Sequence, residues 1–224
     1  MRHQKVKVSV ALFWGMAFMS LQAQSVKDID GNTYQMVTIG TQTWMKENLK
    51  VTHYRNGDAI ETTPFDASGI ITEIEPKYQW AYDGKVSNAD VYGRLYTWYA
   101  VTDSRSVCPT GWHVPSYTEW ATLVDFLGGR SVAVGKLRKP GGGHWNSPDS
   151  AATNETGFTA LLSGQRRYNG VYKYKEYFCG WWSSTDGSLG SKSSIFNLNI
   201  GNFGKPLREH NEESMGIPVR CLKD

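Results

Sequence analysis

The amino-acid sequence predicts an α+β fold built from short strands, tight turns and few helices. Three observations predict it. The chain is rich in aromatic residues and glycine, with 9 Trp, 12 Tyr, 8 Phe and 23 Gly among 224 residues. Helical periodicity is found in the first half of the chain, whereas strand-like alternation dominates the second half. About 200 residues remain after an N-terminal targeting segment, which suits one domain with a substantial core.

The first 23 residues have the pattern of a cleaved secretory signal peptide. Arg2, Lys5 and Lys7 give a cationic start, residues 8–21 are almost wholly apolar, and Ala23 supplies a small residue at the expected cleavage point. The apolar run is shorter than the roughly 20 residues that a membrane-spanning helix needs. We therefore expect residues 1–23 to be removed and residues 24–224 to form one exported domain, whether periplasmic, cell-surface or secreted. No later segment is long and apolar enough to span a bilayer.

The positive net charge of the whole chain comes from this signal segment. The formal net charge is +3, from 24 Lys and Arg against 21 Asp and Glu. Because residues 1–23 contribute three cations and no acid, the remaining chain is formally neutral. No stripe of Lys and Arg is evident, so we expect neither nucleic acid as a partner nor a transmembrane segment after cleavage.

The first expected elements are a hairpin and a helix. Residues 33–39 and 42–45 alternate around Gly40-Thr41, which predicts a β-hairpin. Residues 28–32 resemble a calcium loop but lack its ligand spacing, so we interpret them as an ordinary turn. A short strand is expected at 78–82, before an Asp83-Gly84 turn. In residues 92–101 the aromatic and apolar residues recur at helical spacing, which predicts a helix.

The clearest helix begins after Ser116. Ser116 is a good N-cap and Glu119 follows three residues later, as in a capping box. The predicted buried stripe follows one face, and Gly128-Gly129 predicts the end of the helix. The stripe consists of Trp120, Leu123, Val124 and Leu127. Beyond Gly129 the helical pattern fades, and residues 140–148 are expected to form a loop.

Short strands are expected over the rest of the chain. Asn169-Gly170 predicts a two-residue hairpin turn, because both residue types accept positive φ. The other expected strands cover residues 157–162, 181–185, 194–200 and 217–222. The 23 glycines and these short alternating runs together account for the predicted class.

Three cysteines, Cys108, Cys179 and Cys221, allow one disulfide and one leftover thiol in an oxidising compartment. Their number alone does not select the pair.

Several strings, in their order and spacing, resemble the Fibrobacter succinogenes major paralogous domain over residues 26–224. The strings are Asp28–Tyr34 (DIDGNTY), Trp44–Leu49 (WMKENL), Tyr92–Tyr96 (YGRLY), Cys108–Ser116 (CPTGWHVPS), Glu119-Trp120, Asn154–Phe158 (NETGF), Trp181–Thr185 (WWSST) and Val219–Cys221 (VRC). The resemblance implies an exported, surface-associated bacterial protein whose biochemical role is poorly defined.

The same resemblance implies a fold and a disulfide. The family is similar to the C-type lectin-like fold, which it shares with the formylglycine-generating sulfatase-modifying proteins. That fold has short twisted antiparallel strands, about two helices and long loops. It implies a bridge between Cys108 and Cys221 that leaves Cys179 unpaired. The reactive cysteine pair of the sulfatase-modifying proteins has no counterpart here, so their activity is not transferred.

No constellation of residues predicts catalysis, a metal site or a cofactor. The five histidines, at positions 3, 53, 113, 144 and 210, lack zinc-hydrolase spacing, and we interpret His113 as structural. No nucleophile elbow or phosphate loop is present. Cys179 lies among aromatic residues and is interpreted as a buried thiol.

Aromatic residues instead predict a binding surface. Tyr168, Tyr172, Tyr174 and Tyr177 crowd one segment beside Arg167, and tyrosine rings stack on sugars or anchor protein partners. Strand alternation would place Tyr172 and Tyr174 on one face. We therefore expect an exported, non-enzymatic binding module for a glycan or a cell-surface protein. A structural subunit of a surface appendage is the alternative, and an enzyme with an unrecognised site is a third possibility.

Overall fold

The structure is a computed structural model that describes residues 24–63, 71–140, 152–175, 177–186, 192–198 and 208–224. Helices α1 to α4 and antiparallel strand pairs make it a mixed α and β fold, as the α+β prediction requires. The four α-helices in the described residues exceed the roughly two that the family resemblance implied. No helix in the described part of the chain is long and apolar enough to cross a membrane.

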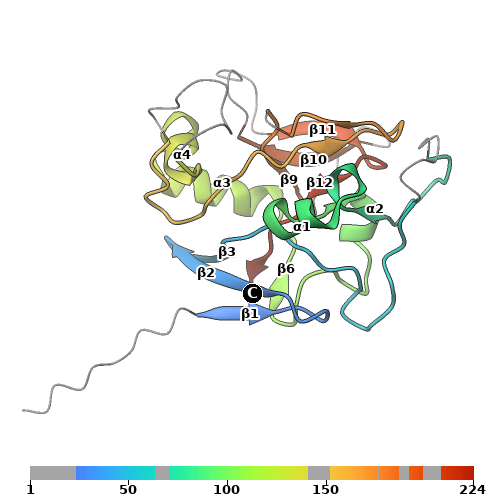
Figure 1. Ribbon diagram of the computed structural model, residues 1–224. Helices are drawn as coiled ribbons and strands as arrows, with labels where there is room; N and C mark the ends of the chain where they lie inside the picture. Colours follow the sequence, from blue (N-terminus) through green and yellow to red (C-terminus); the bar gives the residue numbers. More distant parts are fainter. Residues whose placement is uncertain (1–23, 64–70, 141–151, 176, 187–191, 199–207) are drawn as a thin grey trace, which may run out of the picture.

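The first sheet has the order β1-β2-β3-β13-β6 and lies at the lower side of the molecule in Figure 1. Its strands are β1 (Ser25–Lys27), β2 (Thr33–Ile39), β3 (Gln42–Met45), β13 (Leu222–Lys223) and β6 (Trp112–His113). The predicted hairpin is confirmed as β2 and β3, with Ile39 opposite Gln42. The 28–32 turn is also confirmed, because the Asp28 carboxylate accepts hydrogen bonds from the Asn32 backbone and side chain and from the Tyr34 hydroxyl.

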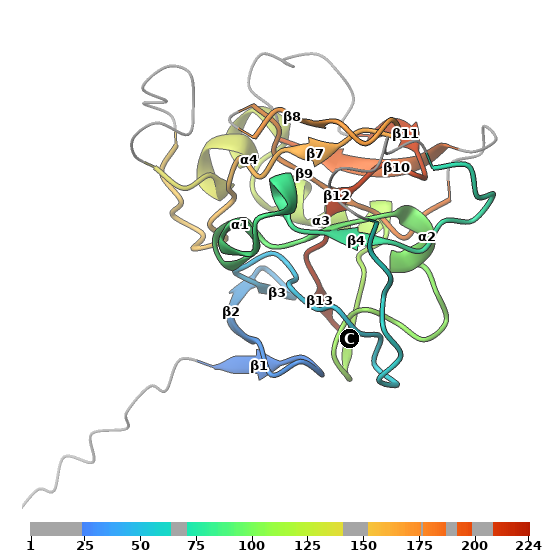
Figure 2. The same cartoon turned by 45° about the vertical axis from the view of Figure 1, so that its right-hand side comes forward.

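The other strands form three smaller sheets on the opposite side (Figure 2). One contains β11 (Arg208–Glu212), β10 (Lys192–Asn197) and β9 (Gly180–Trp182). Another contains β12 (Ile217–Pro218), β5 (Leu95–Tyr96) and β4 (Gln79–Trp80). The third is the hairpin of β7 (Gln165–Arg166) and β8 (Tyr172–Lys173). The expected strand at 217–222 is therefore split between two sheets.

The single helix predicted at 92–101 is wrong. The structure has α1 (Val86–Tyr92), strand β5 and a short α2 (Trp98–Val101) instead. Gly93 ends α1 with φ +77, and a Cβ there would lie 2.5 Å from the Cβ of Asn48. The chain must therefore leave the helix at Gly93, and β5 then pairs with both β4 and β12, which buries both of its residues.

Helix α3 (Tyr117–Phe126) confirms the predicted capping box. The backbone N–H of Glu119 donates to the Ser116 hydroxyl, and the Glu119 carboxylate accepts from the Ser116 backbone N–H. The predicted end of this helix at Gly128-Gly129 is confirmed, because α3 stops at Phe126 and both glycines have positive φ. The expectation that no helix follows Gly129 is wrong, because α4 (Arg130–Leu137) begins at once. Gly129, at φ +89, is the N-cap of α4, so one glycine pair separates two helices.

The expected strand at 157–162 does not form. Gly157 and Thr159 have φ values of 71° and 59°, which interrupt any extended run, and only Ala160 makes an isolated bridge to Arg138. The 78–82 strand is confirmed in shorter form as β4. The predicted Asp83-Gly84 turn is a 3-10 turn, η1 (Tyr82–Gly84). Parts of the expected 140–148 loop and of the expected 194–200 strand lie outside the described residues.

Helix α3 packs between the first sheet and β10 through a stack of buried rings. The Trp120 ring lies 4.5 Å from Trp44 and 4.4 Å from Phe196, centroid to centroid, and is nearly parallel to the latter. Phe158 and Trp181 pack edge-on against each other beside it, at 5.6 Å. Each of these five rings is fully buried, so together they supply much of the apolar area that stabilises the fold.

The disulfide between Cys108 and Cys221 is confirmed. Both cysteines are buried, and the bridge closes a sequence separation of 113 residues. It ties the loop before β6 to the residue that precedes β13. Cys179 is buried and takes no part in the disulfide, as the family resemblance implied.

Candidate binding surface

The predicted binding residues lie on the β7–β8 hairpin and on the segment that follows it. The Arg167 N–H donates to the Val171 carbonyl oxygen and the Gly170 N–H donates to the Arg167 carbonyl oxygen, both at 2.9 Å. The loop therefore contains three residues, 168–170, rather than the predicted two. Gly170 has φ +83 whereas Asn169 does not have a positive φ, so the loop is a type I turn that ends in a left-handed glycine.

Three of the four predicted tyrosines are exposed on this hairpin and the segment that follows it. Tyr168, Tyr174 and Tyr177 have exposed fractions of 43%, 44% and 57%, and Val171 is 43% exposed. These four are among only ten large apolar or aromatic side chains that are exposed in the described part of the chain. We call them the tyrosine ridge. Such clustering distinguishes this segment from the isolated exposed apolar residues that any surface carries.

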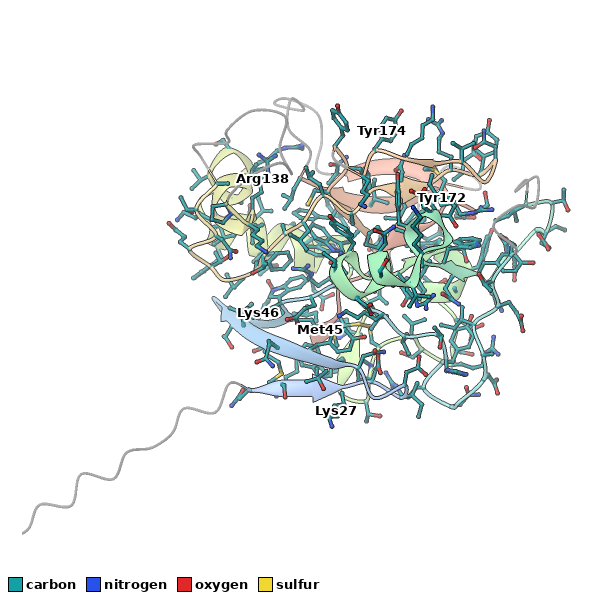
Figure 3. The ribbon with its side chains drawn as sticks, in the orientation of Figure 1. Lys27, Met45, Lys46, Arg138, Tyr172 and Tyr174 are labelled. Carbon is teal, nitrogen blue, oxygen red and sulfur yellow. A yellow bond between two sulfur atoms is a disulfide. The ribbon has the colours of Figure 1, made fainter. Side chains whose placement is uncertain are left out.

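Tyr172 occupies a different environment from the ridge. Its ring lies 5.3 Å from that of Tyr82, edge-on, and it is half-buried. Burial raises the pKa of Tyr172, and the charge and hydrogen bond of Arg166 oppose that rise. In Figure 3 Tyr174 lies at the upper edge of the molecule and Tyr172 lies lower, toward α1. Tyr172 therefore anchors the hairpin rather than facing solvent with the ridge.

Strand alternation does not extend from Tyr172 to Tyr174. Strand β8 ends at Lys173, and Tyr174 has φ +64, in the left-handed region that is costly for a residue with a side chain. The backbone N–H groups of Tyr177 and Phe178 both donate to the Tyr174 carbonyl oxygen, at 2.9 and 2.7 Å. This turn holds Tyr174 in its unusual conformation and places Tyr177 on the exposed side of the same segment.

Two cations hold the hairpin on aromatic residues of the core. The Arg166 guanidinium lies 4.2 Å from the Trp80 ring centroid and is almost fully buried. Lys175 donates a 3.0 Å hydrogen bond to the Asn88 side chain, and its ammonium lies 5.0 Å from the Tyr92 ring centroid. Cation–π contacts of this kind contribute most when they are shielded from water. They attach the hairpin rigidly to β4 and α1.

Gly164 permits the close approach that this attachment needs. A Cβ at Gly164 would lie 2.5 Å from the Tyr82 ring and 2.8 Å from the Lys175 Cα. The residue also has φ +71, which favours glycine. The sequence analysis did not identify these anchoring residues, because Trp80, Tyr82 and Asn88 precede the hairpin by about 80 residues and no local pattern connects them.

His113 lies between two carboxylates at the junction of β6 and α3. Its Nδ1 is 2.6 Å from Asp224 Oδ1, and its Nε2 is 2.9 Å from Glu119 Oε1. Burial alone would lower the pKa of His113, but the hydrogen bonds and charges of Asp224 and Glu119 outweigh it and raise the pKa above 6.5. Because a carboxylate lies within hydrogen-bonding distance of each ring nitrogen, the imidazolium form can donate to both. His113 thereby links Glu119, near the start of α3, to Asp224, just after β13.

Within the described residues, neither His53 nor Cys179 joins this cluster. His53 Nδ1 lies 2.6 Å from Asp30 Oδ1 on a partly exposed loop. His144 lies outside the described residues, as does the side chain of His210. Burial raises the pKa of the Cys179 thiol to about 12, so the thiol is protonated at neutral pH and ill suited to nucleophilic attack. Within the described residues, no group of three or more His, Cys, Asp or Glu side chains could hold a metal ion.

Arg220 is a buried residue whose role the sequence did not reveal. Its Nε and Nη2 donate to Asn48 Oδ1 at 3.1 and 2.7 Å, and Nη1 donates to the Phe158 carbonyl oxygen. Trp181 Nε1 donates to the same Asn48 oxygen at 2.7 Å. Burial lowers the pKa of Arg220 to about 9, which still leaves it charged at neutral pH. These bonds join β9 and the segment before β13 to the segment after β3, and Arg220 also to the loop that carries Phe158.

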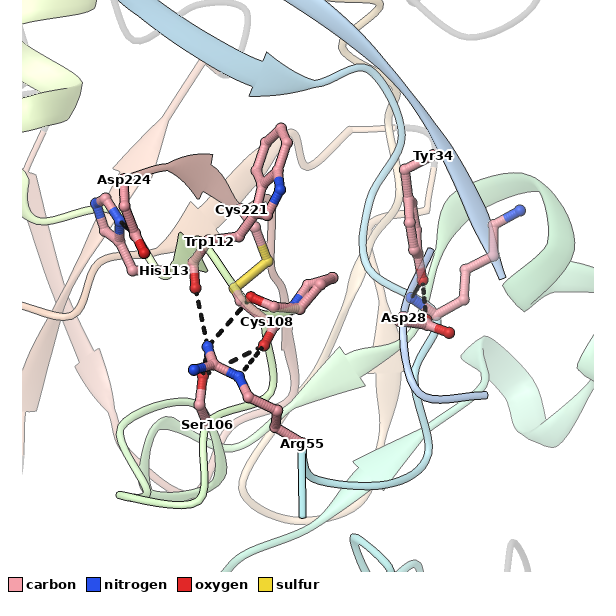
Figure 4. The surroundings of a disulfide bond; sticks show 11 residues. Asp28, Tyr34, Arg55, Ser106, Cys108, Trp112, His113, Cys221 and Asp224 are labelled. Carbon is pink, nitrogen blue, oxygen red and sulfur yellow. Dashed lines mark hydrogen bonds and ion pairs between the residues drawn. A yellow bond between two sulfur atoms is a disulfide. The ribbon is translucent and has the colours of Figure 1, made fainter. Parts of the chain in front are cut away.

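A shallow groove of about 270 Å³ lies beside the disulfide, between β1 and the loop that carries Cys108 (Figure 4). Arg55 forms part of its lining and donates from Nε to the Cys108 carbonyl oxygen at 3.1 Å. Its Nη2 also donates to Ser106 Oγ and to the carbonyl oxygens of Pro109 and Trp112. Arg55 therefore fixes this loop, and the groove is less distinctive as a binding site than the tyrosine ridge.

Comparison with known proteins gives one match. A family model described as Fibrobacter succinogenes major domain matches residues 37–223. No curated protein and no solved structure matches the chain significantly.

Proposed function

The chain belongs to the Fibrobacter succinogenes major domain family, and from this premise we propose that it is an exported, non-enzymatic binding module. Its contact surface is the tyrosine ridge of the β7–β8 hairpin, with Arg167 beside it. The ligand is a glycan or a protein on a cell surface.

The observation that carries this proposal is the exposure of three tyrosines on an anchored support. Tyr168, Tyr174 and Tyr177 are each at least 43% exposed. The hairpin beneath them is attached through Arg166 on Trp80 and through Lys175 to Asn88. A rigid support lowers the entropy cost of binding, and tyrosine rings offer large contact areas with few rotatable bonds.

We also propose export and a C-type lectin-like fold as the setting of this function. Export rests on the sequence of residues 1–23, with cleavage after Ala23, and intact mass measurement of the protein recovered from cells tests it. The fold proposal is supported by the Cys108–Cys221 bridge, which ties the last strand to the loop before β6. An experimental structure superposed on C-type lectin-like domains tests it, and a different strand order in the superposition would rule it out.

The binding proposal is tested with single variants of the ridge. Tyr168→Ala, Tyr174→Ala and Tyr177→Ala are compared with the unmodified domain on a glycan array and in cross-linking to intact cells. Phe126→Ala is the matched control, because Phe126 is a 63% exposed ring on α3 and lies outside the hairpin. We expect each ridge variant to lose binding at least fivefold while its thermal unfolding stays close to that of the parent.

Three other outcomes are informative. If the ridge variants bind as well as the parent, the ridge is not the contact surface. If no glycan on the array binds the domain, and cross-linking joins copies of this chain through the ridge, the domain is an assembly subunit instead. Turnover of a glycan by the purified domain would contradict the non-enzymatic part of the proposal.

A further inference from the structure

Positive charge is concentrated in the same segment as the ridge. Residues 166–177 contain four cations, Arg166, Arg167, Lys173 and Lys175, against a single acid at position 176. Residues 24–224 as a whole balance 21 cations against 21 acids. The segment therefore carries a local surplus of three positive charges, whereas the rest of residues 24–224 has 17 cations against 20 acids.

The structure divides these four cations into two pairs. Arg166 and Lys175 turn inward, onto the Trp80 ring and the Asn88 amide. Arg167 and Lys173 belong to the other face of the hairpin. The register sets Arg166 opposite Tyr172 on the inward face, so alternation places Arg167 and Lys173 on the outward one.

The outward pair is accessible to solvent. Lys173 is exposed and Arg167 is partly exposed. Within the described part of the chain, neither side chain makes a hydrogen bond or ion pair to the protein, in contrast to Arg166 and Lys175. Two cations on one face, close to exposed tyrosines, are thus available to a ligand.

The positive charge of Arg167 and Lys173 favours ligands that carry acidic groups. Arg and Lys side chains donate hydrogen bonds and accept none, so they favour carboxylate or sulfate oxygens over the hydroxyl groups of a neutral sugar. Tyrosine rings stack on the apolar faces of sugar rings. We propose that the tyrosine ridge binds an acidic polysaccharide, with sugar rings against the tyrosines and acid groups on Arg167 and Lys173. This inference rests on the proposed function and specifies its ligand class.

The experiment uses two matched pairs of polymers. Binding of the domain is measured by affinity electrophoresis and calorimetry with polygalacturonate and its carboxyl-reduced form, and with dextran sulfate and dextran. Each pair keeps the sugar backbone and changes its charge. We expect at least one acidic polymer to bind at least tenfold more tightly than its neutral counterpart, with an affinity that falls as NaCl is raised from about 50 to 300 mM.

Protein variants separate specific contacts from general attraction. Arg167→Gln combined with Lys173→Gln is expected to weaken binding at least tenfold, whereas Arg167→Lys keeps a cation and should retain most of it. Lys27→Gln is the control, because Lys27 is an exposed lysine at the opposite end of the molecule from Tyr174 (Figure 3). Unchanged binding by the double glutamine variant would overturn the inference. An equal loss in the Lys27→Gln variant would also overturn it, because that result shows non-specific attraction.

The failure of this inference is distinguishable from the failure of the proposed function. Suppose that a neutral glycan or a surface protein binds, and that Tyr168→Ala removes this binding while the charge variants do not. The proposed binding function is then supported, and the proposed acidic ligand class is wrong. If none of the polymers, glycans or cell surfaces binds, both proposals fall.

Discussion

The ring of Tyr172 packs edge-on against the ring of Tyr82, with centroids 5.3 Å apart. This contact joins the hairpin that carries the exposed tyrosines to the buried segment between β4 and α1. The stability of the candidate binding surface is therefore linked to residues about 90 positions earlier in the chain.

The first prediction concerns this pair. In a double-mutant cycle with Tyr82→Leu and Tyr172→Leu, we expect a coupling of about 0.5–1.5 kcal/mol in the free energy of unfolding, because each variant removes the same ring–ring contact. Chemical denaturation of the two single variants, the double variant and the parent measures it. Strictly additive costs would show that the two rings do not interact energetically.

The second prediction concerns the disulfide. Replacing both Cys108 and Cys221 by serine should lower the free energy of unfolding by about 2–5 kcal/mol without reductant, because the bridge restricts a long loop in the unfolded chain. In dithiothreitol the parent should approach the double variant. Cys179→Ala serves as control, since it removes a buried sulfur but leaves the bridge, and its smaller cost should not depend on the reductant. A Cys179 peptide found in a disulfide would refute the pairing.

The third prediction is a pH dependence of stability set by His113. Its pKa is raised in the folded protein, so its stabilising contribution is complete below the unfolded value near 6.5 and is lost as pH rises through the folded value. The pKa of Glu119 is lowered, because hydrogen bonds from Ser116 and His113 outweigh the effect of its burial. Its contribution is present above about 4.5 and is lost as pH falls.

The stability of the parent should therefore pass through a maximum between these two limits. His113→Gln should remove the decline above pH 6.5 at a cost of about 1 kcal/mol or less, since the cluster is partly exposed and screened by solvent. Urea denaturation of both proteins at a series of pH values measures the difference. An unchanged slope in the variant would mean that another group titrates in this range.

The fourth prediction concerns the buried guanidinium of Arg220. Arg220→Met should lower the free energy of unfolding by about 2–4 kcal/mol, because Asn48 Oδ1 and the Phe158 carbonyl oxygen each lose a buried donor. Arg220→Lys should not restore stability, since an ammonium group cannot reproduce the fork that reaches both acceptors. Full stability of the lysine variant would show that charge alone is required.

Local patterns predicted the elements that depend on local interactions. The capping box at Ser116 and Glu119 and the hairpin around Gly40 depend on residues only a few positions apart, and both are confirmed. The disulfide followed from the family resemblance rather than from the number of cysteines. The exposed tyrosines could be proposed from their density in the sequence, although their individual orientations could not.

The wrong and missed predictions have identifiable physical causes. Tyr92, Leu95, Tyr96 and Tyr99 have helical spacing, but Gly93 lies against Asn48 and strands β4 and β12 compete successfully for Leu95 and Tyr96. Tertiary pairing there outweighs local propensity. Helix α4 was missed because its hydrophobic periodicity is weak, and Arg220 because its acceptors lie 172 and 62 residues away in the chain.

The position of β13 within the first sheet also has a consequence for the order of folding. This strand lies between β3 and β6, so two strands from the first half of the chain gain a shared neighbour only when residues 222–223 arrive. The sheet therefore cannot be completed before residues 222–223 are available to pair. The long sequence separation between β13 and its two partner strands also favours slow formation of this sheet.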